Sequence, residues 1–336
     1  MATSIHASAS ANENICARNC PGESALTTIR VATASPDKGE YVATAALEGR
    51  AARVRTHRRF AFLRRILDIR LVGPSLIILL IVIVSALGAG LISPHDPSTQ
   101  DYTAFTQGPS LSHPLGTDDL GRDVLARLIY GARISLQVGI IAVGIAVTLG
   151  VTLGLLSGYA GGFVDDLIMR FVDAVQAFPT LVLALAITAA LGPNVANAMI
   201  AIRFVSIPAM ARLTRGQTLT VREHEYVTAA RVIGVSPLRI MLRHILPNTT
   251  APIIVQATLL IASAIVTEAS LSFLGVGVQP PTPTWGGMLR TGSQYLETAP
   301  WIAFSAGTAI FLTVLAFNFV GDGLRQALDP RLRTRR

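Results

Sequence analysis

Residues 225–248 read EYVTAARVIGVSPLRIMLRHILPN and form a polar stretch between two long apolar ones. Residues 223–233 favour a short helix, and Gly234 follows where a left-handed backbone commonly ends one. Ser236 and Pro237 suit the N-cap and the first position of a second helix. The pattern predicts an elbow, which is two short helices joined at an angle by a glycine.

The predicted elbow offers a surface that another protein could contact. We expect Pro247 to end its second helix. Ala229 and Ala230 leave room for close approach, and three arginines add charge: Arg231, Arg239 and Arg243. The same composition also fits an amphipathic loop that lies on lipid headgroups. The residues alone leave both interpretations open.

Stretches without charge predict six membrane-spanning helices. A helix needs about 20 apolar residues to cross a bilayer core of about 30 Å. Only 14% of the 336 residues are charged and 51% are hydrophobic, whereas soluble domains carry roughly 25% charged residues, so an ordinary soluble enzyme is excluded. The predicted spans are residues 71–92, 134–159, a third ending near 191, 195–211, 252–273 and 301–320.

The distribution of arginine predicts the orientation of the spans. With the N-terminus inside, 23 of the 28 basic residues fall in cytoplasmic segments and four fall outside. Basic residues are enriched in cytoplasmic loops, so both termini are predicted to be cytoplasmic. Eight arginines within residues 50–70 directly precede the first span. We interpret them as a basic juxtamembrane anchor, with nucleic-acid binding as the alternative.

The remaining segments complete the predicted domain organisation. Residues 1–49 lack both a long apolar run and a signal-peptide pattern, so we expect a disordered cytoplasmic tail. Cys16 and Cys20 are interpreted as a free pair in that tail. A transmembrane domain, residues 71–331, contains the inner loop 212–250, and residues 332–336 form a short basic tail.

A second motif, HPLGTDDLGRD at residues 113–123, precedes the second span on the outer side. Thr117 and Asp118 can cap the helix that follows. The helix would have one apolar face and lead along the membrane interface into the span: Val124, Leu125, Leu128 and Ile129. Four residues could instead ligate a metal ion: His113, Asp118, Asp119 and Asp123. Capping and ion pairing explain the same residues, so no metal site is expected.

The elbow resembles the EAA loop of integral-membrane permeases of ABC importers. That pattern is Glu-Ala-Ala, three residues, Gly, nine residues and Ile-x-Leu-Pro, and five positions match it in register: Ala229, Ala230, Gly234, Leu246 and Pro247. Thr228 replaces the Glu, and His244 replaces the Ile. The missing Glu is expected to weaken one contact with an ATPase while leaving the helix-glycine-helix shape.

From about Phe60 to Arg331, the chain resembles the second permease subunit of dipeptide and oligopeptide importers. Permeases for nickel and glutathione share much of this pattern and remain alternatives. The matching segments are HPLGTDDLGRD (113–123), YGARISLQVG (130–139), EYVTAARVIGVS (225–236), RHILPN (243–248), EASLSFLGVGVQPPTPTWG (268–286) and GDGLRQALDPR (321–331).

The resemblance implies an all-α, six-helix type I ABC importer permease fold. A second homologous permease would complete the pathway, two cytoplasmic ABC ATPases would drive it, and an extracytoplasmic peptide-binding protein would deliver di- or oligopeptides. The membrane would be the bacterial plasma membrane. ATP and Mg would lie on the ATPases, so this chain is expected to bind no cofactor.

Two groups of residues follow from the matching motifs. The ATPase-coupling loop would comprise Glu225, Thr228, Ala229, Ala230, Arg231, Gly234, Ser236, Arg239, Leu246 and Pro247. The outer-loop motif would comprise His113, Gly116, Thr117, Asp118, Gly121, Arg122 and Asp123.

The sequence contains no recognisable catalytic motif. Lys38 is the only lysine and has no glycine-rich loop before it, so a P-loop ATPase site is excluded. Any coupling to ATP must therefore come from a partner, and we predict that the chain is not an enzyme.

Arg203 and Glu268 are candidates for the pathway or a gate. The family usually has a small residue at Arg203 and an aromatic one at Ile207. An arginine facing lipid near mid-bilayer costs at least about 2.5 to 3.5 kcal/mol, so Arg203 should face the pathway or a partner helix. Glu268 is either a gate at the outer mouth or a structural group held by a fixed salt bridge or by a hydrogen bond to a neighbouring helix. Alternatives from other classes are a proton-coupled carrier using both residues and a non-transporting scaffold.

Overall fold

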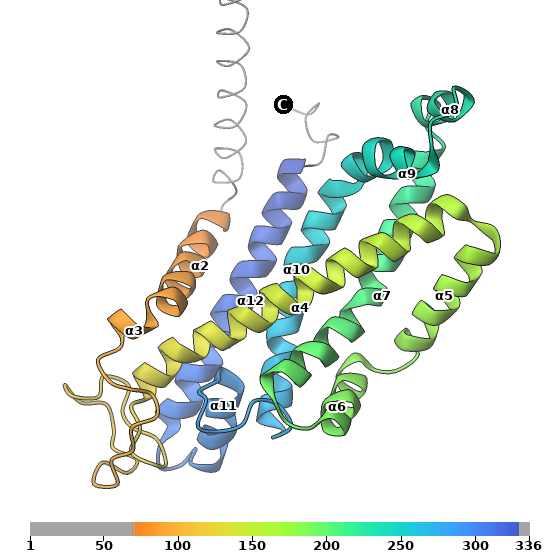
Figure 1. The fold of residues 1–336 in the computed structure, drawn as a ribbon. Helices are drawn as coiled ribbons and strands as arrows, with labels where there is room; N and C mark the ends of the chain where they lie inside the picture. The colour runs from red at the N-terminus through yellow and green to blue at the C-terminus, as the bar shows by residue number, and fades with distance from the viewer. Residues whose placement is uncertain (1–68, 70, 329–336) are drawn as a thin grey trace, which may run out of the picture. The chain divides into compact units, whose positions relative to one another are not determined.

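A computed structural model describes Ile69 and residues 71–328, and every regular element in that part of the chain is helical (Figure 1). The predicted all-α membrane fold class is thereby confirmed. The predicted tails, residues 1–49 and 332–336, and the basic segment 50–70 apart from Ile69 lie outside the described residues.

The elements are, in chain order, α2 (Val72–Leu87), α3 (Ala89–Ile92), α4 (Val124–Ala160), α5 (Gly162–Gln176), α6 (Thr180–Leu191), α7 (Val195–Arg222), α8 (Glu225–Val232), α9 (Pro237–Ile240), the π-helix η1 (Met241–Ile245), α10 (Leu246–Phe273), α11 (Trp285–Gln294) and α12 (Pro300–Leu328).

Four of the six predicted spans are single helices long and apolar enough to cross a membrane: α4, α7, the continuous helix Pro237–Phe273 and α12. Each helix continues beyond the predicted apolar run into polar sequence. In particular, α4 begins at Val124, so the segment predicted to lie along the interface is the first part of this span. The spans were predicted from stretches without charge, so the charged ends of these helices were not included in them.

The prediction of one unbroken first span over residues 71–92 is wrong within the described residues. The helix α2 has 16 residues, or about 24 Å, and the four-residue α3 follows a break at Gly88. Gly88 has φ −89° and ψ 10°. Glycine costs about 1 kcal/mol relative to alanine inside a helix, and Gly88 and Gly90 weaken helix propagation at this point.

The third span is a bent pair rather than one straight helix. The axes of α5 and α6 meet at 87°. Pro179 precedes α6 with φ −55° and ψ 128°. A proline disfavours helical backbone at the residue before it, so the chain turns at Phe178 instead of continuing α5.

The closest helix packing joins α4 to α7, and three glycines make it possible. Gly150, Gly154 and Gly158 lie four residues apart on one face of α4. A methyl group added to Gly154 would lie 2.5 Å from the carbonyl oxygen of Ala211, and one added to Gly158 would lie 2.7 Å from Cβ of Thr218. Small residues at this spacing let membrane helices approach backbone to backbone.

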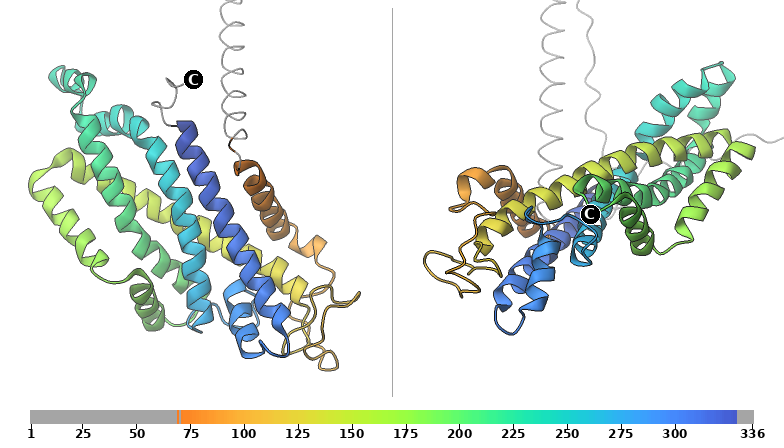
Figure 2. Two further views of the ribbon diagram at one scale, coloured as in Figure 1. Left: turned by 180° about the vertical axis from the view of Figure 1, so that it is seen from behind. Right: turned by 60° about the horizontal axis from the view of Figure 1, so that its bottom comes forward.

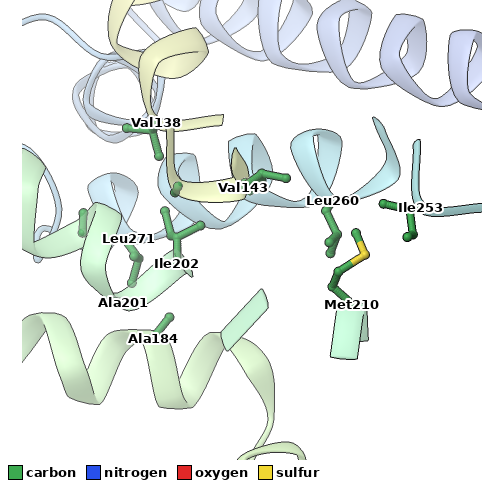
Figure 3. Close-up of a cluster of buried hydrophobic side chains, with 12 residues drawn as sticks. Val138, Val143, Ala184, Ala201, Ile202, Met210, Ile253, Leu260 and Leu271 are labelled. Atoms are coloured by element: carbon green, nitrogen blue, oxygen red, sulfur yellow. The ribbon is translucent and has the colours of Figure 1, made fainter. Parts of the chain in front are cut away.

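A buried apolar cluster extends this contact to α6 and α10 (Figure 3). Val138 and Val143 of α4 belong to it together with Ile202 of α7, and Leu260 of α10 lies beside Met210 of α7. Figures 1 and 2 show α4 crossing α12, α10 and α7. Only 22–44% of the residues in the most apolar windows of the four single spans are buried, which leaves broad faces for lipid or another chain.

Ion pairs tie α5 to α7 at the end of α7 that leads to the elbow. Arg215 donates from Nε to Oδ1 of Asp165 at 2.6 Å and from Nη2 to Oδ2 at 2.5 Å. Such bidentate pairs are geometrically specific as well as strong. Arg212 and Asp173 add a second, exposed pair at 2.6 Å.

The α4–α7 contact predicts opposite outcomes for two identical substitutions in α4. Gly154→Ala should destabilise the protein by about 1–3 kcal/mol, because the added methyl has no space. Gly144→Ala is the control, since nothing lies within 4 Å of its added methyl, and it should be neutral or slightly stabilising. Thermal unfolding of the purified proteins in detergent measures both. Equal melting temperatures for the two variants would contradict close α4–α7 packing.

Candidate functional site

The structure confirms the predicted elbow between α7 and α10. Gly234 has φ +78°, a left-handed conformation that glycine adopts without steric cost. The amide of Val235 donates to the carbonyl of Ala230 at 3.1 Å, as expected where a helix ends in this conformation. Ser236 is the N-cap residue of α9 and Pro237 is its first residue. At the opposite end of the helices from α11, α8 projects beyond the spans (Figure 1).

Pro247 does not end the second helix, so that prediction is wrong. The elements α9, η1 and α10 form one continuous helix, Pro237–Phe273, and Pro247 lies in the first turn of α10. Proline lacks an amide hydrogen and its ring clashes with the carbonyl four residues earlier in a regular α-helix. The π-helix η1, Met241–Ile245, ends two residues before Pro247 and changes the hydrogen-bond pattern of the helix at this point.

One face of the elbow packs against the membrane helices. Val227 and Ile240 are fully buried. They belong to one apolar cluster that also contains Leu155 of α4 and Val221 of α7. Ala230 belongs to this cluster with 6% exposure. Ala230 therefore cannot leave room for another protein as predicted, and of the alanine pair only Ala229 is exposed.

The opposite face of the elbow is exposed and partly apolar. Val232 and Ile233 are 81% and 78% exposed, and Leu238 is 63% exposed. The sequence analysis did not identify these three residues, which lie at the end of α8 and in α9. Arg231 and Arg239 lie beside them, and the guanidinium of Arg231 is 5.7 Å from the ring of Tyr159. An apolar patch rimmed by polar groups is typical of a docking surface.

The other predicted loop residues lie mostly on the exposed surface. Leu246 is half-buried, and the following are exposed: Glu225, Thr228, Gly234, Ser236 and Pro247.

A cavity of about 360 Å³ lies where the α5–α6 bend meets α7 and α10. Polar side chains line part of it: Gln176, Thr180, Ser206 and Ser263. Sequence analysis did not identify these residues, because the bend that brings Gln176 and Thr180 together was not predicted. A polar-lined hollow among apolar helices is a place where a polar solute can be accommodated.

Arg203 lies one turn before Ser206 on α7. The α7 residues that line the cavity are Val205, Ser206 and Ala209, and Arg203 is not among them. It is half-buried, and within the described residues its guanidinium makes no ion pair or side-chain hydrogen bond. The predicted orientation toward a pathway or partner stays a prediction.

Glu268 is fully buried in α10 and links it to α4. It accepts a hydrogen bond from Ser272 at 2.8 Å and a longer one from Ser135 of α4 at 3.4 Å. Of the predicted roles, this geometry fits the structural one, a hydrogen bond to a neighbouring helix. The cavity beside Ser206 and Ser263 does not include Glu268.

The outer-loop motif is a hydrogen-bonded turn centred on Asp118. Its carboxylate accepts from the amides of Leu120 and Arg122, both at 2.9 Å, and pairs with the Arg122 guanidinium at 2.7 Å. Arg127 of α4 is 3.4 Å away. Burial and the neighbouring Asp118 raise the pKa of Asp119.

The other motif residues support the same turn. Gly116 and Gly121 have φ +74° and +69°. A methyl group on Gly121 would overlap the backbone of Asp101. The Nε1 of Trp301 donates to the carbonyl of Thr117 at 3.1 Å, so the turn is attached to α12.

The prediction that Thr117 and Asp118 cap the next helix is wrong. The N-cap residue is Asp123, which accepts from the amide of Ala126 at 2.7 Å. Asp118 is held by two arginines instead, and Thr117 donates to Ala104. Several acidic residues could have capped this helix, and only the tertiary contacts decide among them.

Comparison with known proteins gives consistent matches. Residues 150–334, over half of the chain, match the family described as binding-protein-dependent transport system inner membrane component. Residues 62–109 match the N-terminal transmembrane domain of oligopeptide transport permease C.

Two relatives illustrate the similarity over most of the chain. The sequence is 49% identical over 273 residues to the glutathione transport system permease protein GsiD of Shigella flexneri, covering 81% of this chain and 90% of the relative. It is 48% identical over 265 residues to the di/tripeptide transport system permease protein DppC of Pseudomonas aeruginosa, covering 77% and 88%.

The contacts of Glu268 predict that its size matters more than its charge for stability. Glu268→Ala should lower the free energy of unfolding by about 2–5 kcal/mol, because it leaves a cavity and two serine hydroxyls without a partner. Glu268→Gln retains an acceptor and should melt near the parent, as should the exposed control Glu297→Ala. Thermal unfolding in detergent compares the three. A parent-like Glu268→Ala, or a Glu268→Gln that melts normally but loses uptake, would contradict a purely structural role.

Proposed function

The chain belongs to the family of inner-membrane components of binding-protein-dependent transport systems, and on that premise we propose that it forms half of the pathway of an ABC importer for di- and oligopeptides. The observation that carries this proposal is the exposed elbow, which connects directly to two spans that line one cavity. Glutathione is the alternative substrate, because relatives of similar identity are named for each.

The chain is a multi-pass inner-membrane protein, and we propose that its termini and the elbow are cytoplasmic. The arginine distribution supports this orientation, because the predicted inner segments hold most of the basic residues. We propose that separate ATPase subunits hydrolyse the ATP. The absence of a P-loop lysine motif in the sequence supports that assignment.

The exposed face of the elbow is the proposed docking surface for an ATPase. Val232, Ile233 and Leu238 supply apolar area, while Arg231 and Arg239 supply charge around it. The buried face is anchored by Val227 and Ile240. A partner that moves α8 would therefore displace the ends of α7 and α10 as well.

The cavity beside the α5–α6 bend is the proposed contribution of this chain to the pathway. A second homologous permease would supply the opposite wall, since the spans keep broad unburied faces. Gln176, Ser206 and Ser263 offer hydrogen-bonding groups suited to peptide amides. The proposed role of Arg203, one turn before Ser206 on α7, is to bind a substrate carboxylate in the pathway, a group that both peptides and glutathione carry.

A substitution at Gly234 tests whether the elbow couples ATP hydrolysis to uptake. Gly234→Val should leave ATPase activity in the assembled importer and abolish most uptake, because a side chain in the left-handed conformation costs roughly 1–2 kcal/mol and distorts the elbow. The measurement is ATP-dependent uptake of a radiolabelled dipeptide, and in parallel of glutathione, into proteoliposomes containing the importer and its binding protein.

Gly216→Val is the matched control for this experiment. Gly216 is exposed in the regular helix α7 with open space around it, so the same substitution should leave uptake near the parent level. Normal uptake by Gly234→Val would contradict the coupling role. If the parent protein takes up substrate in response to a proton gradient and without ATP, the ABC assignment is wrong and a proton-coupled carrier is supported.

The proposed role of Arg203 predicts a dependence on the carboxylate of the substrate. Arg203→Gln should raise the KM for a dipeptide roughly tenfold or more, since hydrogen bonds to charged groups contribute about 1.5–3 kcal/mol. Arg203→Lys should retain part of the affinity. A C-terminally amidated dipeptide should be much less sensitive to the substitution. An equal increase in KM for the free and the amidated peptide would show that Arg203 does not bind the carboxylate.

A further inference from the structure

Three side chains from separate parts of the sequence meet at the start of α4. His95 follows α3, His113 opens the outer-loop motif, and Asp123 is the N-cap of α4. The Nδ1 atom of His113 lies 3.0 Å from Oδ1 of Asp123, and Nδ1 of His95 lies 3.9 Å from Oδ2. One ligand atom from each residue lies within 4.8 Å of the other two.

We propose that His95, His113 and Asp123 bind one divalent transition-metal ion of the zinc type. Two imidazoles and one carboxylate are a donor set that such ions use when they keep an open coordination position. Ligand atoms around a tetrahedral zinc lie about 3.3 Å apart, given bond lengths of about 2.0–2.1 Å. The separations of 3.0 and 3.9 Å involve different oxygens of Asp123. With one ligand atom from each residue, the three atoms lie within 4.8 Å of one another, so rotation of the side chains would bring them to this spacing.

The surrounding charges distinguish Asp123 from the other two aspartates of the outer-loop motif as a metal ligand. Asp118 is neutralised by Arg122 and Arg127, and Asp119 is paired with Arg122. Asp123 is only 2% exposed at its side chain, and within the described residues its salt-bridge partners are the two histidines alone. With neutral imidazoles, the site holds one buried negative charge that a cation can balance.

The two histidines of the cluster are accessible to solvent, and their side chains have room to move. The side chain of His113 is 18% exposed and that of His95 is 42% exposed, so an ion can enter from solvent and His95 can rotate toward it. One carboxylate oxygen of Asp123 remains bound to the amide of Ala126. That hydrogen bond fixes the orientation of the ligand, as outer hydrogen bonds do in other metal sites.

A bound ion would fasten the outer loop at both of its ends. His95 lies at the end of the loop that follows α3, and Asp123 lies at the end that leads into α4. The turn between them is already attached to α12 through Trp301 and Thr117. Metal binding should therefore raise the thermal stability of the described outer loop and its attachment to α4.

The test is a zinc titration of the purified full-length permease. A non-histidine affinity tag is used, Cys16 and Cys20 are replaced with serine, and the protein is treated with chelator beforehand. Competition with a chromophoric chelator should give one ion per chain and a raised melting temperature. His113→Ala and His95→Ala should each weaken zinc affinity about tenfold or more and remove the increase in melting temperature.

Two further variants separate metal binding from folding. Asp123→Asn keeps a side-chain acceptor for the helix cap but loses the negative charge, so it should fold normally and bind zinc more weakly. His224→Ala removes a histidine outside the cluster and should bind like the parent. No zinc binding by the parent, or equal affinity in the parent and the three cluster variants, would overturn the proposal.

Discussion

The backbone contact between α4 and α7 is the constraint on which the rest of the arrangement depends. Gly150, Gly154 and Gly158 leave no space for a side chain between the two helices. In a membrane, water does not drive helices together, so close packing of small residues carries much of the association. The apolar cluster that includes α6 and α10 is built on this contact.

The same contact positions the elbow. Leu155, between Gly154 and Gly158 on α4, packs in the cluster that holds Val227 and Ile240. Tyr159 lies near Arg231 at the end of α4. Both helices of the contact therefore support the buried face of the elbow, while its apolar outer face stays exposed. This arrangement suits the proposed transmission of motion from an ATPase to the cavity.

Local chemistry made much of the elbow predictable from sequence. Gly234, Ser236 and Pro237 have conformational preferences that act over a few residues, and the structure places them as expected. The predicted span boundaries at residues 195 and 273 also agree with the start of α7 and the end of α10. The similarity to a known permease family supplied the fold class and function.

Features set by long-range contacts were not predictable in the same way. The choice of Asp123 over Asp118 as helix cap depends on arginines that compete for Asp118. The convergence of His95 with His113 depends on how the loop folds back. The glycines at positions 150, 154 and 158 were visible as a spacing, and attention to that spacing could have predicted the α4–α7 contact.

The most direct test of the account is co-purification from native membranes. The chain carries a C-terminal tag, the membranes are solubilised gently, and the proteins that accompany it are identified. The account predicts a second, homologous permease together with at least one P-loop ATPase, and loss of the ATPase alone when Val232 and Ile233 are replaced with aspartate. A homo-oligomer without any ATPase, recovered with the elbow intact, would contradict the account.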